Sequence, residues 1–202
     1  MVDLQTGKIQ GALKPHQASG NLALSQDGRW LATAGWHSDK VCLWDVSTGE
    51  LVHVWPKPTA TRVSFARDSR TLVLSTGEKF EFWDVISLKK NLTFACAEPL
   101  YSSQVVFTSD GALMALELTP GVIDLKDTKT GRTVARLEDP SGARSTWTTF
   151  SPDGTQFIAS SNYTKAIRVW DLPKIRVRLK EMGLDWNWPE FPDQTNRFKP
   201  DR

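Results

Sequence analysis

The chain has 202 residues, of which 40% are hydrophobic and 24% charged, as is ordinary for a globular protein. Its formal charge is only +2, so electrostatics favours neither nucleic acid nor a membrane surface as a partner. Cys42 and Cys96 are the only cysteines, which excludes a disulfide framework. No apolar run approaches the ~20 residues of a membrane span, and no secretory signal opens the sequence. We therefore expect a cytoplasmic location.

Two series of aspartates repeat along the chain with nearly the same period. The first lies in turn-like contexts such as Ser25-Gln26-Asp27-Gly28, with spacings of 41, 42 and 43 residues between Asp27, Asp68, Asp110 and Asp153. The second closes apolar runs at Asp3, Asp45, Asp84, Asp127 and Asp171. Trp44, Trp83 and Trp170 directly precede three of them. Two independent markers with one period of about 40 residues indicate a repeat protein.

The residues between the markers alternate with period two, as β-strands do. Each unit carries an apolar pair ahead of its second marker, and these pairs are Val41/Leu43, Phe80/Phe82, Ile123/Leu125 and Ile167/Val169. Asp-Gly and Thr-Gly turns punctuate four short segments of strand length in each unit. Four short antiparallel strands in such a unit are typical of a propeller blade. The sequence thus predicts an all-β fold, with about four blades over residues 1–172.

The blade boundaries leave the arrangement of the ring open. Residues 2–4 are expected to be the remnant of a third strand and residues 8–14 a fourth strand, while the last unit ends after its third strand at Asp171. Three arrangements are compatible with this count. The chain closes a four-bladed ring, two copies assemble into a larger ring, or the chain is the C-terminal part of a longer propeller.

After Asp171 the apolar period changes to three or four residues, which predicts a short helix over residues 173–183. We expect the apolar face of this helix to cover an edge or the base of the propeller. Residues 184–202 form an aromatic, proline-rich extension and a polar tail. Their aromatic side chains either pin the tail onto the blades or offer an extended peptide to a partner.

The segments Val41–Gly49 (Val-Cys-Leu-Trp-Asp-Val-Ser-Thr-Gly) and Ile167–Asp171 (Ile-Arg-Val-Trp-Asp) carry a resemblance to a known family. With the preceding turn Asp-Gly and apolar strand, they resemble the WD repeat, and the resemblance extends over residues 2–172. It is similar in particular to the C-terminal repeats of large bacterial WD-repeat proteins, some of which are fused to protein kinases. There are departures: Lys126 replaces the tryptophan of the third unit, and the Gly-His pair that opens a family repeat is missing. We therefore do not expect the family's buried hydrogen-bond network in the blades.

What the resemblance implies about function is binding without turnover. The repeated residues Trp44, Asp45, Trp83, Asp84, Asp127, Trp170 and Asp171 are expected to serve the fold, because every blade needs them. Candidate contacts lie instead where the units differ, in the loops that would gather on one face. These residues are Trp36, His37, Tyr101, Arg144, Trp147 and Tyr163.

The predicted function is a non-catalytic scaffold or sensor that binds a protein or peptide, with neither nucleic acid nor a membrane as partner and with self-association as a further expectation. No metal or cofactor is expected, because His16, His37 and His53 are scattered and have no ligand spacing. Two alternatives stay open: a propeller enzyme of the hydrolase or lyase type, and a fragment of a larger protein without a function of its own.

Overall fold

The computed structural model describes residues 20–35, 39–57, 60–98 and 104–191 of the chain. Their strands form four antiparallel sheets, which we call blades 1 to 4. Blade 1 contains β1 (Asn21–Leu24), β2 (Trp30–Ala34), β3 (Lys40–Asp45) and β4 (Leu51–Pro56). Blade 2 contains β5 (Arg62–Phe65), β6 (Thr71–Ser75), β7 (Lys79–Asp84) and β8 (Lys89–Ala95). Blade 3 contains β9 (Val106–Phe107), β10 (Leu113–Thr119), β11 (Val122–Asp127) and β12 (Thr133–Glu138). Blade 4 contains β13 (Trp147–Phe150), β14 (Gln156–Ser161) and β15 (Ala166–Asp171).

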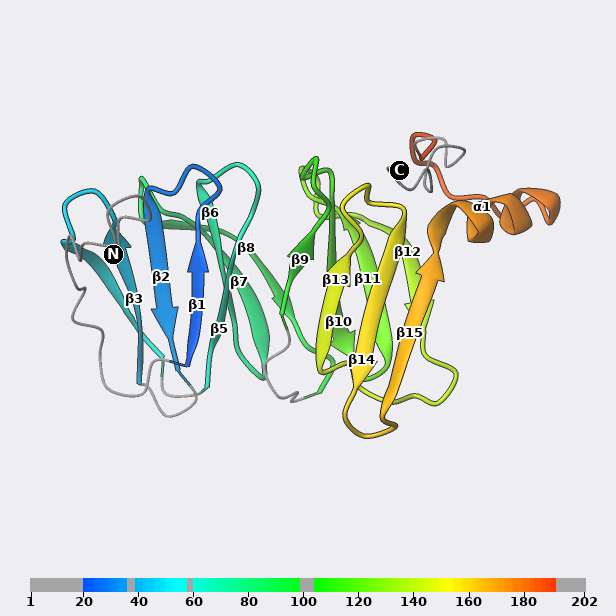
Figure 1. The fold of residues 1–202 in the computed structure, drawn as a ribbon, viewed down its shortest axis with the longest axis horizontal. Coiled ribbons are helices and arrows are strands. Elements are labelled where there is room, and N and C mark those ends of the chain that lie inside the picture. The colour runs from blue at the N-terminus through cyan, green and yellow to red at the C-terminus, as the bar shows by residue number, and fades with distance from the viewer. Residues whose placement is uncertain (1–19, 36–38, 58–59, 99–103, 192–202) are drawn as a thin grey trace, which may run out of the picture.

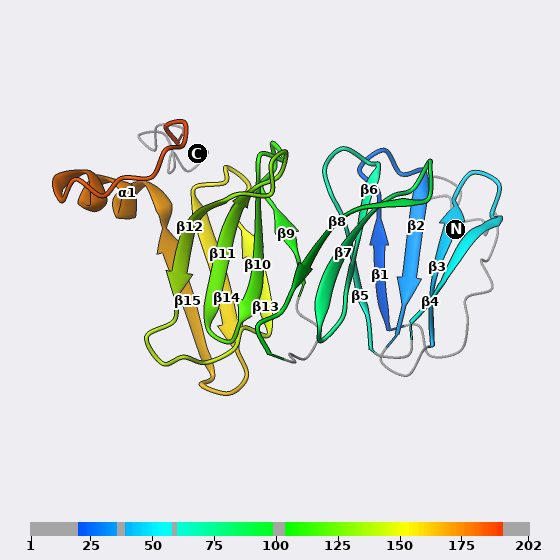
Figure 2. The same ribbon diagram turned by 180° about the vertical axis from the view of Figure 1, so that it is seen from behind.

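Strands follow one another in sequence order within each blade, so every connection is a hairpin. The blades lie side by side, with blade 1 at the left of Figure 1 and blade 4 at the right. Figure 2 shows the same arrangement from behind, where blades 2 and 3 lie toward the viewer. The protein is a four-bladed β-propeller with one short C-terminal helix, as the sequence predicts. The predicted strands within residues 2–14 lie outside the described residues.

The two ends of the strands form two different faces. The hairpins that contain the first aspartate series lie at the top of Figure 1, together with the turns that follow the second series; we call this the turn face. The loops from the second strand to the third, and those from one blade to the next, lie at the bottom; we call this the loop face.

Three hydrophobic cores lie between successive blades. In the first, Val41 and Leu43 of β3 pack with Leu72 and Leu74 of blade 2, and none of the four side chains is exposed. In the second core, Phe80 and Phe82 of β7 pack against blade 3. In the third core, Ile123 and Leu125 of β11 pack against blade 4. The apolar pair of the third strand is therefore the residue pair by which each blade holds the next. Burying one such side chain contributes roughly 1.5–3 kcal/mol.

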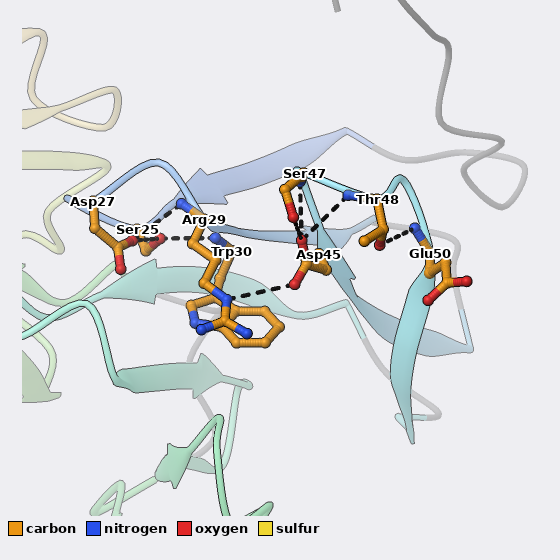
Figure 3. Close-up of polar contacts among 8 residues, drawn as sticks. All are labelled: Ser25, Asp27, Arg29, Trp30, Asp45, Ser47, Thr48 and Glu50. Carbon is orange, nitrogen blue, oxygen red and sulfur yellow. Dashed lines mark hydrogen bonds and ion pairs between the residues drawn. The ribbon is translucent and has the colours of Figure 1, made fainter.

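The first aspartate series closes the hairpin between the first and second strands. In Figure 3, Asp27 accepts hydrogen bonds from the Ser25 hydroxyl and from the backbone N–H of Arg29, and these bonds lower the pKa of the Asp27 carboxyl. The glycine that follows, Gly28, has a φ of 73°, which favours glycine in this turn. Equivalent bonds are made by Asp68, Asp110 and Asp153.

The second aspartate series closes the turn that follows the third strand, also by accepting hydrogen bonds from backbone N–H groups. Asp45 accepts bonds from the Ser47 side chain and from the backbone N–H groups of Ser47 and Thr48 (Figure 3). Asp84 and Asp127 bind the next turns in the same way. In blade 4 no such turn follows, and Asp171 instead accepts a bond from the backbone N–H of Lys174 as the N-cap of α1 (Leu172–Glu181). One residue type thus ends a strand in two different structural contexts.

A remnant of the family's buried hydrogen-bond network survives in blade 1, contrary to expectation. The indole Nε1 of Trp44 donates to Thr33 Oγ1 over 3.1 Å inside the blade. The position equivalent to Thr33 is Leu74 in blade 2, so the buried Nε1 of Trp83 has no acceptor there. It is Ala159 in blade 4. The absence of the Gly-His pair is visible in the sequence. The Thr33–Trp44 hydrogen bond is not, because it depends on how strands β2 and β3 are aligned in the sheet.

Helix α1 begins at Leu172, directly after β15 ends at Asp171, and lies at the turn-face end of blade 4 (Figure 1). Leu172 is completely buried in the third core, whereas Met182, the C-cap of the helix, is 66% exposed. The segment after the helix folds back onto it, because the buried Arg176 guanidinium binds the Asp185 carboxylate and the Pro189 carbonyl. Trp186 and Phe191 then pack against the third core.

A buried ion cluster joins blades 1 and 2. The Glu81 carboxylate on β7 is 3% exposed and binds Lys57, which follows β4, as well as Lys79 and Lys90. Burial alone would raise the pKa of this carboxyl, but the hydrogen bonds and charges of the lysines outweigh burial and lower the pKa to about 2.

We predict that Thr33→Val destabilises the protein by about 1–2 kcal/mol, because the buried Trp44 N–H loses its acceptor while the side-chain shape is kept. Urea denaturation followed by circular dichroism measures the change. Thr33→Ser, which keeps the hydroxyl, is the matched control and should retain more of the stability. Equal losses in the two variants would mean that the hydrogen bond is not what Thr33 contributes.

A second prediction concerns pH. The folded pKa of Glu81 lies below its usual 4.5, so its contribution is present above about pH 5 and is lost as the pH falls toward 2. Glu81→Gln should therefore be less stable than the native chain by about 2–3 kcal/mol at pH 7, with the gap narrowing toward pH 3. Denaturation at pH 7, 5 and 3 measures it, with the exposed Glu78→Gln as control. A gap that is independent of pH would contradict the ionic account.

Candidate protein-binding face

Four equivalent residues stand at the loop-face end of the innermost strands; three are the first residue of their strand, and Gln104 lies two residues before β9. Each stands six positions before the turn aspartate of its blade, and the set is Asn21, Arg62, Gln104 and Trp147. The innermost strands approach one another around a common axis, since residues of β1, β5, β9 and β13 line one open pocket of about 300 Å³. The four side chains are polar or aromatic, whereas the positions after them are mostly apolar. Of the four, Gln104 lines this pocket.

Arg62 and Trp147 meet across this axis, although 85 residues separate them in the sequence. The guanidinium carbon of Arg62 lies 4.6 Å from the centre of the Trp147 ring, in a cation–π contact between blades 2 and 4. Arg62 is 7% exposed, and burial lowers the pKa of its guanidinium. Trp147 remains 56% exposed. The arginine thus holds one face of a large aromatic ring whose remaining surface is open to solvent.

A buried carboxylate organises the loop that leads to Trp147. Glu117, at the end of β10, accepts a hydrogen bond of 2.7 Å from the backbone N–H of Gly121 and one of 3.2 Å from that of Ser145. Burial raises the pKa of this carboxyl. At the other end of the loop, Arg168 of β15 binds the Asp139 carboxylate. Loop 139–146, which carries Arg144, is therefore attached to blade 3 and to blade 4.

The loop between β14 and β15 lies next to this segment. The backbone N–H of Asn162 donates to the Thr146 hydroxyl over 3.0 Å, which ties the two loops together. The following residue, Tyr163, is 67% exposed. Arg144 and Tyr163 therefore come from two connected loops at the loop face of blade 4. Trp147, which the sequence analysis also expects in a loop, is instead the first residue of strand β13.

The other predicted contacts are not tested by the structure, because Trp36, His37 and Tyr101 lie outside the described residues. Sequence reasoning missed Arg62 and Glu117. Arg62 could have been found by aligning the first position of each innermost strand, where its partner Trp147 also stands. Glu117 gives no such signal, since an isolated glutamate in an apolar strand reads as an outward-facing residue.

Among the described residues, no group of three or more His, Cys, Asp or Glu side chains is arranged to hold a metal ion. The acidic groups with the lowest pKa values are engaged in turns or ion pairs, as Glu81 and Asp84 are. No helix in the described ranges has the length and apolar character needed to cross a membrane.

The fold and motifs agree with the comparisons to known proteins. The family model described as "WD domain, G-beta repeat" matches residues 7–45 and 132–171. These two stretches are similar to WD40 repeats, and the four antiparallel sheets have the arrangement of propeller blades. The serine-threonine kinase receptor-associated protein of Dictyostelium discoideum is 27% identical over 169 residues, which are 74% of this chain and 54% of that protein. The chain thus spans about half the length of this curated relative.

Among solved structures, the hydrazine synthase of Kuenenia stuttgartiensis superposes with a TM-score of 0.65 at 18% identity. The match covers 79% of this chain and 48% of that one. At this identity the likeness supports the propeller fold and carries nothing about activity. The further resemblance to bacterial proteins with a kinase domain stays a prediction.

We predict that Glu117→Ala loosens loop 139–146, because the N–H groups of Gly121 and Ser145 lose their acceptor. Trypsin should then cleave after Arg144 several-fold faster than in the native chain, while cleavage after Arg132 stays unchanged. Mass spectrometry of timed digests gives both rates. The control is Glu138→Ala, an exposed carboxylate at the end of β12. Unaltered cleavage after Arg144 would show that Glu117 does not hold the loop.

Proposed function

We propose that this protein is a non-catalytic scaffold that binds a protein or peptide partner through its loop face, with Trp147, Tyr163 and Arg144 among the contacts. The observation that carries the proposal is the exposed Trp147 ring held against the buried Arg62. Tryptophan, tyrosine and arginine are the residues most enriched among those that dominate binding energy in protein interfaces.

The geometry favours binding because the contact residues are held in place before a partner arrives. Trp147 is fixed by Arg62 beneath it, and loop 139–146 is fixed by Glu117 and Arg168. A preorganised site loses less side-chain and loop entropy on association than a mobile one. The turn face is less suited to this role, because the aspartates that the repeat places there are occupied by backbone N–H groups.

The relatives support the same class of function. WD40 proteins generally bind protein partners, and the matching Dictyostelium protein is named for its association with a receptor. The chain covers about half of that relative, so the identity of a partner does not transfer with the likeness. A function without turnover also fits the acidic groups described above, whose hydrogen-bonding capacity the turns and ion pairs occupy.

The test compares partner capture by the native chain with capture by the double variant Trp147→Ala, Tyr163→Ala. We expect proteins that the native chain retains from a cell extract to be lost at least tenfold, as quantified by mass spectrometry. Ile86→Ala is the matched control, because Ile86 is 57% exposed but lies on the turn face. Thermal melting of each variant checks that the fold is kept. Capture that survives in the double variant and falls in the control would place the interface on the turn face.

A further inference from the structure

Blade 4 has three described strands, whereas each of the other blades has four. In blades 1, 2 and 3 a fourth strand, which is β4, β8 or β12, pairs antiparallel with the third strand. Among the described residues, no strand pairs with the outer edge of β15, the third strand of blade 4, which lies at the end of the row of blades in Figure 1. An edge strand of six residues without a proline or a bulge is a template on which another strand can pair.

The backbone groups on the outer edge of β15 are those that the other blades use for pairing. In blade 1, the backbone N–H of Asp45 at the end of β3 donates to the carbonyl of Glu50, just before β4. Asp171 is the equivalent of Asp45, and hydrogen-bonding groups alternate between the two sides of a strand. The backbone N–H and C=O groups of Ile167 and Val169 therefore point from β15 toward the place of a fourth strand.

The outward side chains of β15 form an apolar face that is open to solvent. Ile167 and Val169 are 75% and 55% exposed, whereas the equivalent pairs of blades 1, 2 and 3 are at most 5% exposed. The register places Trp147, Ser160 and Ile167 in one row across blade 4. Residues directly opposite each other in an antiparallel sheet project from the same face. The proposed contact residue Trp147 therefore belongs to the same open face as the apolar pair of β15.

The three complete blades show which side chains a fourth strand places beside such a pair. Opposite the residue equivalent to Ile167 stands a large apolar residue in every case, and opposite the residue equivalent to Val169 the size varies. The first set is Trp55, Phe94 and Leu137, and the second is His53, Leu92 and Ala135. All three residues of the first set pack against the core between their blade and the next. A strand that fits β15 should therefore carry a large apolar residue opposite Ile167.

Arg168 adds a preference for charge. Its equivalent in blade 3 is Asp124, which binds Arg136 of the fourth strand over 2.8 Å. Arg168 has the opposite charge, and its side chain is 32% exposed although it binds Asp139. A carboxylate at the equivalent position of an added strand would complement this charge.

We propose that the protein binds its partner by strand addition: an extended peptide pairs antiparallel with β15 as the fourth strand of blade 4, with a large apolar residue opposite Ile167 and an acidic residue opposite Arg168. This inference rests on the proposed function and names the form of its partner. Strand β15 is held in place from its other face, because Trp170 packs against the third core and Arg168 binds Asp139. Pairing with such a fixed strand requires little ordering of the protein.

The probe is an acetylated and amidated peptide with the sequence of β12 (Thr133–Glu138), in which Arg136→Glu supplies the acidic residue. In the free 202-residue chain the backbone N–H groups of Ile167 and Val169 should exchange rapidly with solvent. Added peptide should protect both, because each donates a new hydrogen bond, whereas the same peptide with Leu137→Asp should not. Hydrogen exchange followed by NMR measures the two amides. Protection in the peptide-free chain, by another segment or a second copy, or no protection by the peptide, would overturn the proposal.

Variants of β15 separate the side-chain contribution from the backbone contribution. Ile167→Ser should weaken binding of the peptide by about tenfold, because the large apolar residue loses its neighbour. Val177→Ser is the matched control, since Val177 is 56% exposed but lies on α1. Val169→Pro removes an N–H that points outward from an edge strand, where proline is tolerated, and should also weaken binding. Thermal melting of each variant checks the fold, and binding that Ile167→Ser leaves unchanged would contradict the proposed pairing.

The same variants distinguish this proposal from the scaffold function. Captured proteins that are lost from the Trp147→Ala, Tyr163→Ala double variant but retained by Ile167→Ser and Val169→Pro would show that the loop face binds without strand addition. In that case the scaffold function stands and the strand-addition proposal is wrong.

Discussion

The structure depends on one constraint: a blade buries its apolar residues only where a neighbouring blade packs against it, as in the three cores between successive blades. A four-stranded sheet this small cannot exclude water alone, so stability arises at the junctions between blades. The apolar pair of the third strand carries this role, as Val41 and Leu43 do in the first core. The polar parts of the repeat have a separate task. The aspartates at the strand ends satisfy backbone N–H groups that the tight turns would otherwise leave without acceptors.

Because packing provides most of the stability, the hydrogen bonds inside the blades can vary. Blade 1 keeps the Trp44–Thr33 bond, and blade 2 replaces the threonine with Leu74, which packs in the first core instead. Blade 3 departs further. Lys126 stands where a tryptophan is usual, and its ammonium group donates to Thr133, pairs with Asp124 and lies 4.7 Å from the centre of the Phe94 ring. Each substitution keeps the junction filled while changing the groups that fill it.

The difference between local repeat features and contacts between blades explains which parts of the structure the sequence can predict. The repeat period can be detected in the sequence because the turn aspartates and the apolar pairs are local features, and they predict the order of the blades. The change of apolar period after Asp171 predicts the helix. The residues of the candidate site can be predicted from the sequence only in part. Trp147 and Tyr163 stand out as aromatic residues where the units differ, but the Arg62 that holds Trp147 comes from another blade, and only the closure of the blades around the axis brings them together. Buried charges such as Glu117 and Arg176 also escape detection, because their partners are backbone groups or residues placed by loops.

The division of the propeller into two faces follows from these constraints. At the turn face every blade needs the same aspartates, and the end of blade 4 uses its aspartate to start α1, whose following segment packs back toward the third core. That face therefore has little freedom to vary. At the loop face the connections differ in length and sequence, and the helix and its extension lie at the other end of blade 4 (Figure 1). A repeat that assigns its structural hydrogen bonds to one face leaves the side chains of the other face free to vary, and the exposed Trp147 and Tyr163 of blade 4 lie at that variable face.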